Sequence, residues 1–211
     1  KAMIKLSEFT PKTNTILQKL IDECFDNEKV MLVHGDSETA EYFTALPFDH
    51  ILFTGSTSIG KKVMKAAAEN LTPVTLELGG KSPVIICDDI KIETAIERLI
   101  LGKCLNAGQM CVSPDYIFCP NDQVDNFITT YKNKFKKMFG EVNNNNDYSS
   151  IINDKQFTRL INLIEDAKNK GAKIISCSDE NFDLVKRKMS TQLLTDVTDD
   201  MRVMQEEIFG P

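Results

Sequence analysis

The segment from Leu71 to Ile86 reads L-T-P-V-T-L-E-L-G-G-K-S-P-V-I-I, and it decides the fold. Apolar and polar side chains alternate from Val74 to Leu78, which predicts a buried β-strand over residues 74–78. Gly79-Gly80 ends that strand, because two glycines allow the backbone to turn sharply or to approach another group closely. A carboxylate at the end of a buried strand is costly unless it is paired or used. Glu77 is therefore a candidate functional residue.

A second motif, G-Q-M-C-V-S-P, places Cys111 after a predicted helix over residues 90–106, where the helix gives way to a loop. Backbone N–H groups at such a junction favour the thiolate, which is the reactive form of cysteine. Taken alone, a cysteine is more often a small buried hydrophobe, and a glutamate at a strand end is more often an ion-pair partner. The two motifs in one chain make the catalytic interpretation of Glu77 and Cys111 the stronger one.

Upstream of Gly80 the hydrophobic pattern alternates between strands and helices. Strands are predicted at residues 2–5, 30–33, 50–53 and 74–78. Helices are predicted to open at Thr10-Pro11 and to cover residues 37–45 and 61–70. This alternation predicts parallel βαβ units whose strands are buried on both faces. The first helix has apolar residues at helical spacing, which predicts one buried face: Ile16, Leu17, Leu20, Ile21, Cys24 and Phe25.

Downstream of Gly80 the pattern predicts strands at residues 83–87, 116–119, 173–177 and 191–195. Helices are predicted at 90–106, 121–139 and 154–170, and residues 140–147, with four consecutive Asn, are predicted to form a flexible loop. We therefore predict an α/β protein. Residues 1–79 hold a partial Rossmann-like parallel sheet, and residues 80–211 hold part of a second α/β domain.

The two motifs together resemble the aldehyde dehydrogenase superfamily, and the resemblance runs along essentially the whole chain. The form T-P-V-T-L-E-L-G-G-K-S-P is most similar to the class 3 branch, which includes the bacterial coniferyl aldehyde dehydrogenases. The resemblance implies an aldehyde dehydrogenase-like fold, with 1–79 as the C-terminal part of the NAD-binding domain and 80–211 as the N-terminal part of the catalytic domain. Family members are longer at both ends, so we expect a longer parent protein.

The resemblance also implies a reaction. The Cys111 thiolate adds to an aldehyde carbonyl, hydride passes to the nicotinamide, and Glu77 acts as general base for hydrolysis of the thioester. The Cys111 N–H is one donor to the oxyanion, and an Asn outside this chain is the other. In an apolar strand end, the pKa of Glu77 is expected to rise toward neutrality. The expected substrate is an aromatic aldehyde such as coniferyl aldehyde, or a medium-chain aliphatic aldehyde.

Two alternatives stay open at this stage. Related enzymes pass the thioester to coenzyme A and need no glutamate base, and Glu77 argues against that reaction. Alternatively, residues 1–211 form a folded module without turnover, because the segments that carry the oxyanion Asn and the substrate channel lie elsewhere.

The cofactor residues come from three segments. F-T-G-S-T-S-I-G is a predicted strand, turn and helix start, and such a turn directs free N–H groups at an anion, although a plain βα turn is an equally good interpretation. By resemblance it lies beside the cofactor pyrophosphate and contributes Gly55, Ser56, Thr57, Ser58, Ile59 and Gly60. The terminal Q-E-E-I-F-G-P contributes Glu207 and Phe209 at the nicotinamide ribose, and Leu78 also lines the cofactor.

The opening I-K-L-S-E resembles the family's I/L-K-P-S-E, with Leu6 in place of Pro. There the Lys and the Glu hold the adenosine ribose, which nominates Lys5 and Glu8. A carboxylate near the ribose 2′-OH favours NAD over NADP. Lys5 can pair with a 2′-phosphate, so NADP is the alternative cofactor.

Composition narrows the classes of function. With 211 residues, 42% of them hydrophobic, the chain can bury a sizeable core, and a net charge of −6 argues against nucleic-acid binding. No apolar run approaches the roughly 20 residues of a membrane span. Six scattered cysteines without a C-x-x-C pair suit a reducing compartment and argue against a metal site. We expect a cytoplasmic protein with a small-molecule aldehyde substrate and no membrane partner, and the resemblance implies a homodimeric parent.

Overall fold

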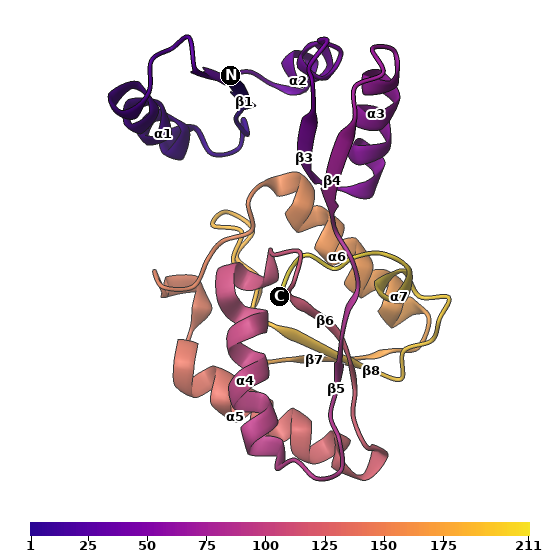
Figure 1. Cartoon of the computed structure of the whole chain (residues 1–211). Helices are drawn as coiled ribbons and strands as arrows, with labels where there is room; N and C mark the ends of the chain where they lie inside the picture. The colour runs from indigo at the N-terminus through magenta and orange to yellow at the C-terminus, as the bar shows by residue number, and fades with distance from the viewer. The chain divides into compact units, whose positions relative to one another are not determined.

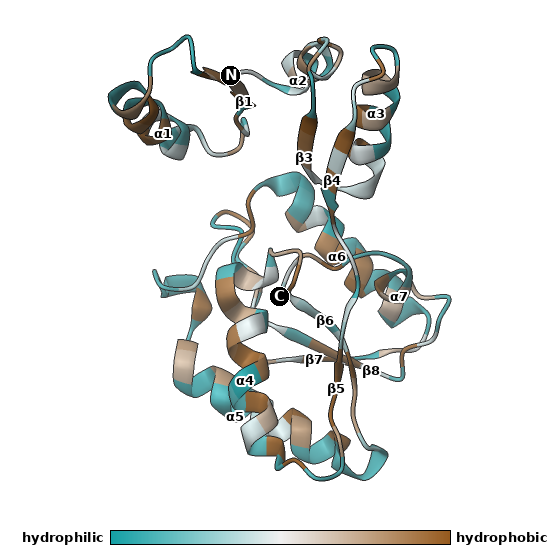
Figure 2. Cartoon of the chain, in the orientation of Figure 1, coloured by the Kyte–Doolittle hydropathy of each residue, from teal (hydrophilic) through white to brown (hydrophobic).

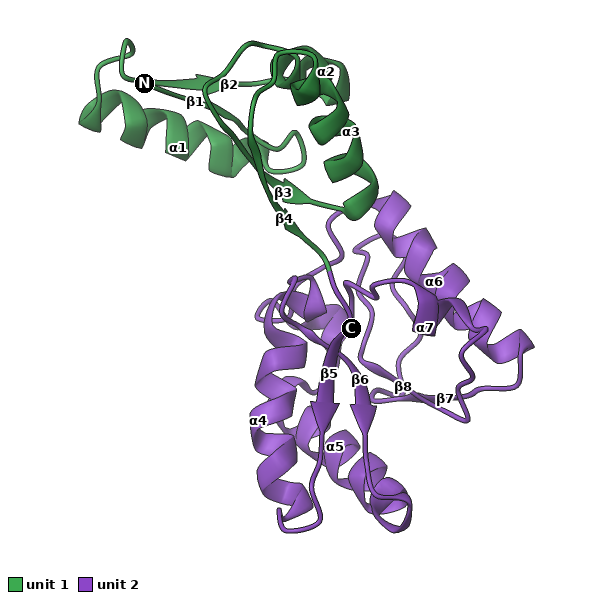
Figure 3. Cartoon of the chain, turned by 45° about the vertical axis from the view of Figure 1, so that its right-hand side comes forward, with its two compact units in different colours: residues 1–79 green, residues 80–211 purple.

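The structure is a computed structural model that describes residues 1–211. The chain divides into two units, Lys1–Gly79 and Gly80–Pro211, shown in green and purple in Figure 3. Helices and strands alternate along most of the first unit and are mixed in the second, and the predicted α/β class is confirmed. None of the helices is long and apolar enough to cross a membrane.

The first unit contains two separate pairs of parallel strands (Figure 1). Strand β1 (Ala2–Lys5) pairs with β2 (Val30–Val33), and helix α1 (Pro11–Cys24) connects them. Strand β3 (Ile51–Gly55) pairs with β4 (Val74–Leu78), and α3 (Thr57–Ala68) connects them. Helix α2 (Ser37–Thr44) lies between the pairs in sequence. The parallel pairing was predicted, but the two pairs do not join into one sheet.

The core of the first unit is small. Its buried apolar residues are Ile51, Val63 and Ala67, with Phe48, Phe53 and Val74 packed around them. The prediction that the apolar face of α1 is buried is wrong, since Ile16 is 60% exposed and Leu20 is 50% exposed. The hydrophobic residues of α1 are visible in Figure 2. The prediction that the strands are buried on both faces is also wrong, since Leu52 in β3 is 70% exposed. The physical reason is the lack of covering elements: each strand pair has one connecting helix.

The second unit has the main core. Helix α4 (Ile92–Cys104) packs along α5 (Val124–Phe139) (Figure 1). It contributes the predicted apolar face, including fully buried Ile96 and Ile100. Helix α6 (Asp154–Asn169) adds Phe157, Leu160 and Leu163 to the same cluster. It ends as predicted before Gly171, whose φ of 102° suits only glycine.

The strands of the second unit also form two pairs. Strand β5 (Ser82–Ile85) is parallel to β6 (Pro114–Phe118), and β7 (Lys173–Ser176) is antiparallel to β8 (Gln192–Thr195). A short helix, α7 (Arg202–Gln205), follows β8. Three 3₁₀ turns complete the unit: η1 (Leu105–Gly108), η2 (Asn121–Gln123) and η3 (Val142–Asn144).

Candidate active site

Cys111 lies on an exposed turn that follows α4, as the sequence predicted. The backbone turns left-handed at three consecutive residues before it, with φ of 51° at Asn106 and Ala107 and 73° at Gly108. The Ser113 N–H then donates to the Met110 carbonyl at 3.0 Å and closes a tight turn around the cysteine. The Cys111 N–H donates to no protein acceptor, so it is free to bind an oxyanion.

Gln109 fixes this turn from the upstream side. Its side chain is buried, and its amide nitrogen donates to the carbonyls of Asn106 and Ser150, each at 3.0 Å. Its amide oxygen accepts the Ile152 N–H at 2.9 Å. Because three hydrogen bonds fix both ends of the amide, Gln109 anchors the segment two residues before Cys111 to residues 150–152.

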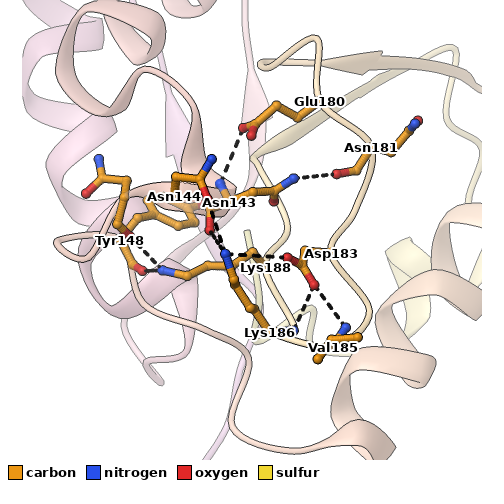
Figure 4. A network of polar contacts seen from close by, with 10 residues as sticks. Asn143, Asn144, Tyr148, Glu180, Asn181, Asp183, Val185, Lys186 and Lys188 are labelled. Carbon is orange, nitrogen blue, oxygen red and sulfur yellow. Dashed lines mark hydrogen bonds and ion pairs between the residues drawn. The ribbon is translucent and has the colours of Figure 1, made fainter.

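The segment just before residues 150–152 is also held in place. Figure 4 shows residues 143–148 facing residues 180–188. Asn143 donates to the Asn181 carbonyl at 3.0 Å, and the buried Lys188 ammonium donates to the carbonyls of Asn145, at 2.8 Å, and Tyr148. Val142 is 1% exposed. The predicted loop at 140–147 contains the 3₁₀ turn η3 and makes hydrogen bonds to residues 181–188, although Asn143 Oδ1 has no partner; its flexibility stays a prediction.

Two lysines hold the chain on the downstream side of Cys111. The Lys103 ammonium, in the last turn of α4, donates to the Pro114 carbonyl at 3.0 Å. The Lys81 ammonium lies 2.5 Å from Asp115, whose side chain is only 3% exposed. Burial lowers the pKa of Lys103 to about 8, and the Lys81 charge adds to that effect while Asp115 opposes it. The start of β6 is therefore fixed by two cations.

The C-terminal motif meets the cysteine loop. A Cβ at Gly108 would lie 2.2 Å from the Gly210 carbonyl oxygen, so the two backbones are in direct contact there. Arg159 donates to the carbonyls of Glu207 and Ile208, at 3.1 and 2.5 Å. Phe209 has a φ of 46° and is 38% exposed. The second unit thus brings together the motifs that contain Lys81, Cys111 and Glu207.

In the first unit, Glu77 lies on an exposed position of β4. The expectation of a buried carboxylate is therefore wrong. Thr75 and Glu77 face the side of the strand pair that nothing in the unit covers, while Val74, Leu76 and Leu78 are half-buried. Exposure leaves the Glu77 carboxylate available to a ligand or to solvent.

The predicted pyrophosphate turn also belongs to the first unit. Helix α3 begins at Thr57 and not at the predicted Lys61, so residues 57–60 form its first turn. Ser56 is the N-cap, and the N–H groups of Thr57 and Ser58 donate to no protein acceptor. These two residues and Ile59 are exposed, and such a helix start fits an anionic phosphate.

Two glycines shape the same turn. A Cβ at Gly60 would lie 2.7 Å from Leu78 Cδ2, and one at Gly55 would lie 2.5 Å from the Phe53 ring. Glycine at these positions therefore lets α3 approach β4 and keeps the turn clear of side chains. Leu78 packs beneath the first turn of the helix.

Lys5 and Glu8 form an ion pair at the end of β1, with Lys5 Nζ 3.2 Å from Glu8 Oε2. A hydrogen bond from its own backbone lowers the pKa of Glu8, and Lys5 lowers it further while burial opposes them. Glu8 is therefore ionised at neutral pH. An ammonium and a carboxylate can each hydrogen-bond to a sugar hydroxyl, and the Lys5 ammonium is already paired with Glu8.

Sequence reasoning did not assign roles to Lys81, Gln109, Asp115 or Arg159. A signal was available for two of them, since Lys81 and Asp115 each stand beside an apolar strand, where a charge requires a partner. Nothing in the sequence paired them, because they lie 34 residues apart.

The comparisons decide the family. The profile described as "Aldehyde dehydrogenase family" matches residues 1–211. This chain belongs to the aldehyde dehydrogenase family. It is 48% identical to a "Probable coniferyl aldehyde dehydrogenase" of Pseudomonas aeruginosa over its whole length, and 42% identical to the "Coniferyl aldehyde dehydrogenase" of a Pseudomonas species. The resemblance to these enzymes and to the class 3 branch is confirmed.

Solved aldehyde dehydrogenases have the same fold. The structure described as the substrate-bound state of Staphylococcus aureus AldH matches all of this chain with a TM-score of 0.90 and 40% identity. The Mycobacterium tuberculosis aldehyde dehydrogenase complexed with NAD+ matches 99% of it with a TM-score of 0.86 and 30% identity. The chain spans 44% of the length of both Pseudomonas relatives and 45% of the AldH structure.

Proposed function

We propose that the parent protein oxidises an aldehyde to the carboxylic acid with NAD, and that Cys111 is the nucleophile. The observation that carries the proposal is the Cys111 turn: an exposed thiol with a free N–H beside it, on a backbone anchored by Gln109 upstream and by Lys81 and Lys103 downstream. Anchoring on both sides holds the nucleophile in one orientation, which lowers the entropic cost of attack.

The chemical steps use groups that this chain supplies. The Cys111 thiol loses its proton to solvent and its sulfur forms a bond to the aldehyde carbon, while the π electrons of the carbonyl move to the oxygen; the Cys111 N–H donates to this oxyanion. NAD, when bound, accepts the hydride that leaves that carbon. The product is a thioester on Cys111, and Glu77 removes a proton from the water that hydrolyses it. The bond from carbon to sulfur breaks and Glu77 passes the proton to the leaving sulfur, so the carboxylic acid and the free Cys111 thiol result.

Within the first unit the residues present fit a dinucleotide. The free N–H groups of Thr57 and Ser58 would hold the pyrophosphate, and the ionised Glu8 would accept hydrogen bonds from the adenosine ribose. In this proposal 1–79 is the C-terminal part of the NAD-binding domain and 80–211 the N-terminal part of the catalytic domain. The substrate is an aromatic aldehyde of the coniferyl type or a medium-chain aldehyde, because the coniferyl enzymes are similar along the whole chain.

Site-directed variants of the parent protein test the chemistry. With coniferyl aldehyde and NAD, Cys111→Ser should abolish NADH formation, while Cys87→Ser, which changes another exposed cysteine, should keep it. Glu77→Gln should give a burst of NADH and then slow turnover, because only hydrolysis is impaired. An unchanged steady-state rate in Glu77→Gln removes that residue from the mechanism. A requirement for coenzyme A would favour the acylating alternative.

The choice of cofactor has its own test. The Glu8 carboxylate should repel a 2′-phosphate, so the parent should prefer NAD, and Glu8→Gln should narrow the ratio of kcat/KM for NAD to that for NADP. Lys5→Ala should reduce kcat/KM for both cofactors and harm NADP more. A parent that prefers NADP would show that this ion pair does not contact the ribose.

The second candidate function concerns residues 1–211 alone, which would form a folded module that does not turn over substrate. The observation that favours it is the small core of the first unit, which leaves both strand pairs partly exposed. We expect no measurable NADH formation from residues 1–211 and weak binding of NAD. Activity equal to that of the parent would contradict this proposal.

A further inference from the structure

The Lys81 ammonium is a junction of three hydrogen bonds within the second unit. It donates to Asp115 Oδ1 at 2.5 Å, to the Val203 carbonyl at 2.7 Å and to the Glu206 carbonyl at 3.0 Å. A lysine has three N–H donors, so all of them are used. One residue of the L-E-L-G-G-K-S-P motif thus binds the strand after Cys111 and the chain before Glu207.

Asp115 and Arg159 hold the next residues of the C-terminal motif. The second carboxylate oxygen of Asp115 accepts the Ile208 N–H at 2.9 Å. Arg159 donates from its two terminal nitrogens to the carbonyls of Glu207 and Ile208. The backbone around Glu207 is therefore fixed from both sides by three charged side chains. We call Lys81, Asp115 and Arg159 the brace.

The brace leaves one carboxylate free. The Glu206 side chain accepts from Arg202 Nε at 2.8 Å. The Glu207 side chain makes no ion pair and no hydrogen bond with the protein, although it is half-buried. A fixed backbone that presents an unpaired carboxylate is the arrangement expected of a ligand-binding group that is oriented before the ligand arrives.

We propose that Lys81, Asp115 and Arg159 are positioning residues that orient the Glu207 carboxylate toward the cofactor ribose and so set the affinity for NAD. This inference rests on the proposed function, because it requires that Glu207 binds the nicotinamide ribose. Asp115 lies in β6, four residues after Cys111. Its carboxylate therefore connects the strand that follows Cys111 to the segment that contains Glu207. None of the three residues contacts the reacting atoms.

The test is a double-mutant cycle for NAD binding in the parent protein. Glu207→Gln and Arg159→Met should each raise the Kd for NAD about tenfold, the effect of losing one hydrogen bond to a charged group. The double variant should bind no more weakly than Glu207→Gln, because the brace acts through Glu207. Lys81→Met should behave like Arg159→Met. Arg159→Lys, which keeps the charge, should recover part of the affinity and guards against a variant that fails to fold.

Two controls separate positioning from general damage. Lys134→Met on α5 removes an ion pair with the exposed Glu97 on α4, 3.1 Å long, and should leave the Kd unchanged. The rate of Cys111 alkylation without NAD should be the same in Arg159→Met and the native protein.

Two results would overturn the inference. If Arg159→Met and Lys81→Met bind NAD normally while Glu207→Gln binds weakly, the brace does not position Glu207 and the proposed function stands. If Glu207→Gln also binds NAD normally, the cofactor role of Glu207 fails together with the inference.

Discussion

Cys111 is one of three exposed cysteines, together with Cys24 and Cys87, whereas Cys104 and Cys177 are buried. The thiols of the buried pair are held neutral: burial raises the pKa of Cys104 and raises that of Cys177 to about 12. Exposure alone therefore does not single out Cys111. Its tight turn and free backbone N–H distinguish it from Cys24, which ends a helix.

We predict that Cys111 is alkylated fastest of the six cysteines by iodoacetamide at pH 7.5, and that Cys104 and Cys177 do not react in the folded chain. Peptide mapping by mass spectrometry after short exposures gives each rate. NAD should change the rate at Cys111 in the parent protein and leave Cys24 unaffected. Faster labelling of Cys24 or Cys87 would remove the main support for the nucleophile.

Lys103 predicts a dependence of stability on pH. The pKa of Lys103 is about 8 in the folded chain and about 10.5 in the unfolded chain. Between these two pH values the unfolded state therefore binds more protons than the folded state. The free energy of unfolding should therefore rise with pH over this range, by at most about 3 kcal/mol from this residue. Below pH 8 the contribution should be constant.

Urea unfolding of residues 1–211 and of Lys103→Met at pH 7, 9 and 10 isolates the effect. The native chain should gain stability relative to the variant as the pH rises, because only the native chain carries the buried ammonium. The comparison cancels the titration of buried thiols, which acts in the opposite direction. A difference that stays constant from pH 7 to 10 would contradict the proposed burial of this ammonium.

At the scale of elements, two glycines near the end of α4 have opposite roles. Gly102 lies in the helix and is exposed, and a Cβ there would be 3.5 Å from Pro114, an ordinary contact. Gly108 has a left-handed φ and touches the Gly210 backbone. The first glycine only weakens a helix, while the second permits the loop that presents Cys111.

We predict that Gly102→Ala stabilises the second unit by about 0.5–1 kcal/mol, because alanine is the better helix former. Gly108→Ala should destabilise it by about 2 kcal/mol or more, through backbone strain and collision with Gly210. Chemical denaturation monitored by circular dichroism measures both changes. Equal effects of the two substitutions would show that the left-handed turn is not required.

The same elements show what sequence can predict. Periodicity predicted α4 and α6 and their buried faces, because those faces find partners within the chain. The burial of α1 was mispredicted for the converse reason: a periodic apolar stripe indicates a helix and does not say what covers it. The long-range hydrogen bonds of the Asn run at 143–146 were not predicted, because the partner residues lie near positions 181–188.

Some residues of the candidate site were predicted from the sequence and others were not. Cys111, Glu77 and the glycine-rich turn were predicted from motifs, and their positions on a loop, a strand and a helix start follow local rules. Their catalytic and cofactor roles stay predictions. The supporting charges were not predicted, since Lys81 contacts Glu206 across 125 residues and no local pattern encodes that contact.

At the scale of the whole molecule, the two units differ in how much apolar surface they bury. The first has three buried apolar residues in its core and the second has 22, so most of the stabilising burial lies in residues 80–211. We predict that in residues 1–211 the amides of β1 to β4 exchange with solvent faster than those of α4 to α6. Hydrogen exchange followed by mass spectrometry measures both sets.

A urea titration with the same readout extends that prediction. The first unit should lose its protection at a lower urea concentration than the second, because local stability follows local burial. Ala67→Gly should lower the first transition only, and Leu163→Ala, at a fully buried position of α6, should lower the second. A single transition shared by all amides would show that the units unfold together.

Every sheet in the chain has two strands, so every strand has a free edge. Unpaired N–H and C=O groups along an edge accept any other extended segment, including one from another copy of the same chain. Wherever residues 1–211 occur alone, as after proteolysis or a truncating mutation, such edges make them a template for intermolecular β-pairing. The stretch Ile51–Gly55 combines a free edge with the exposed Leu52. Aggregation of a shortened chain should therefore begin there, and a lysine at Leu52 should delay it.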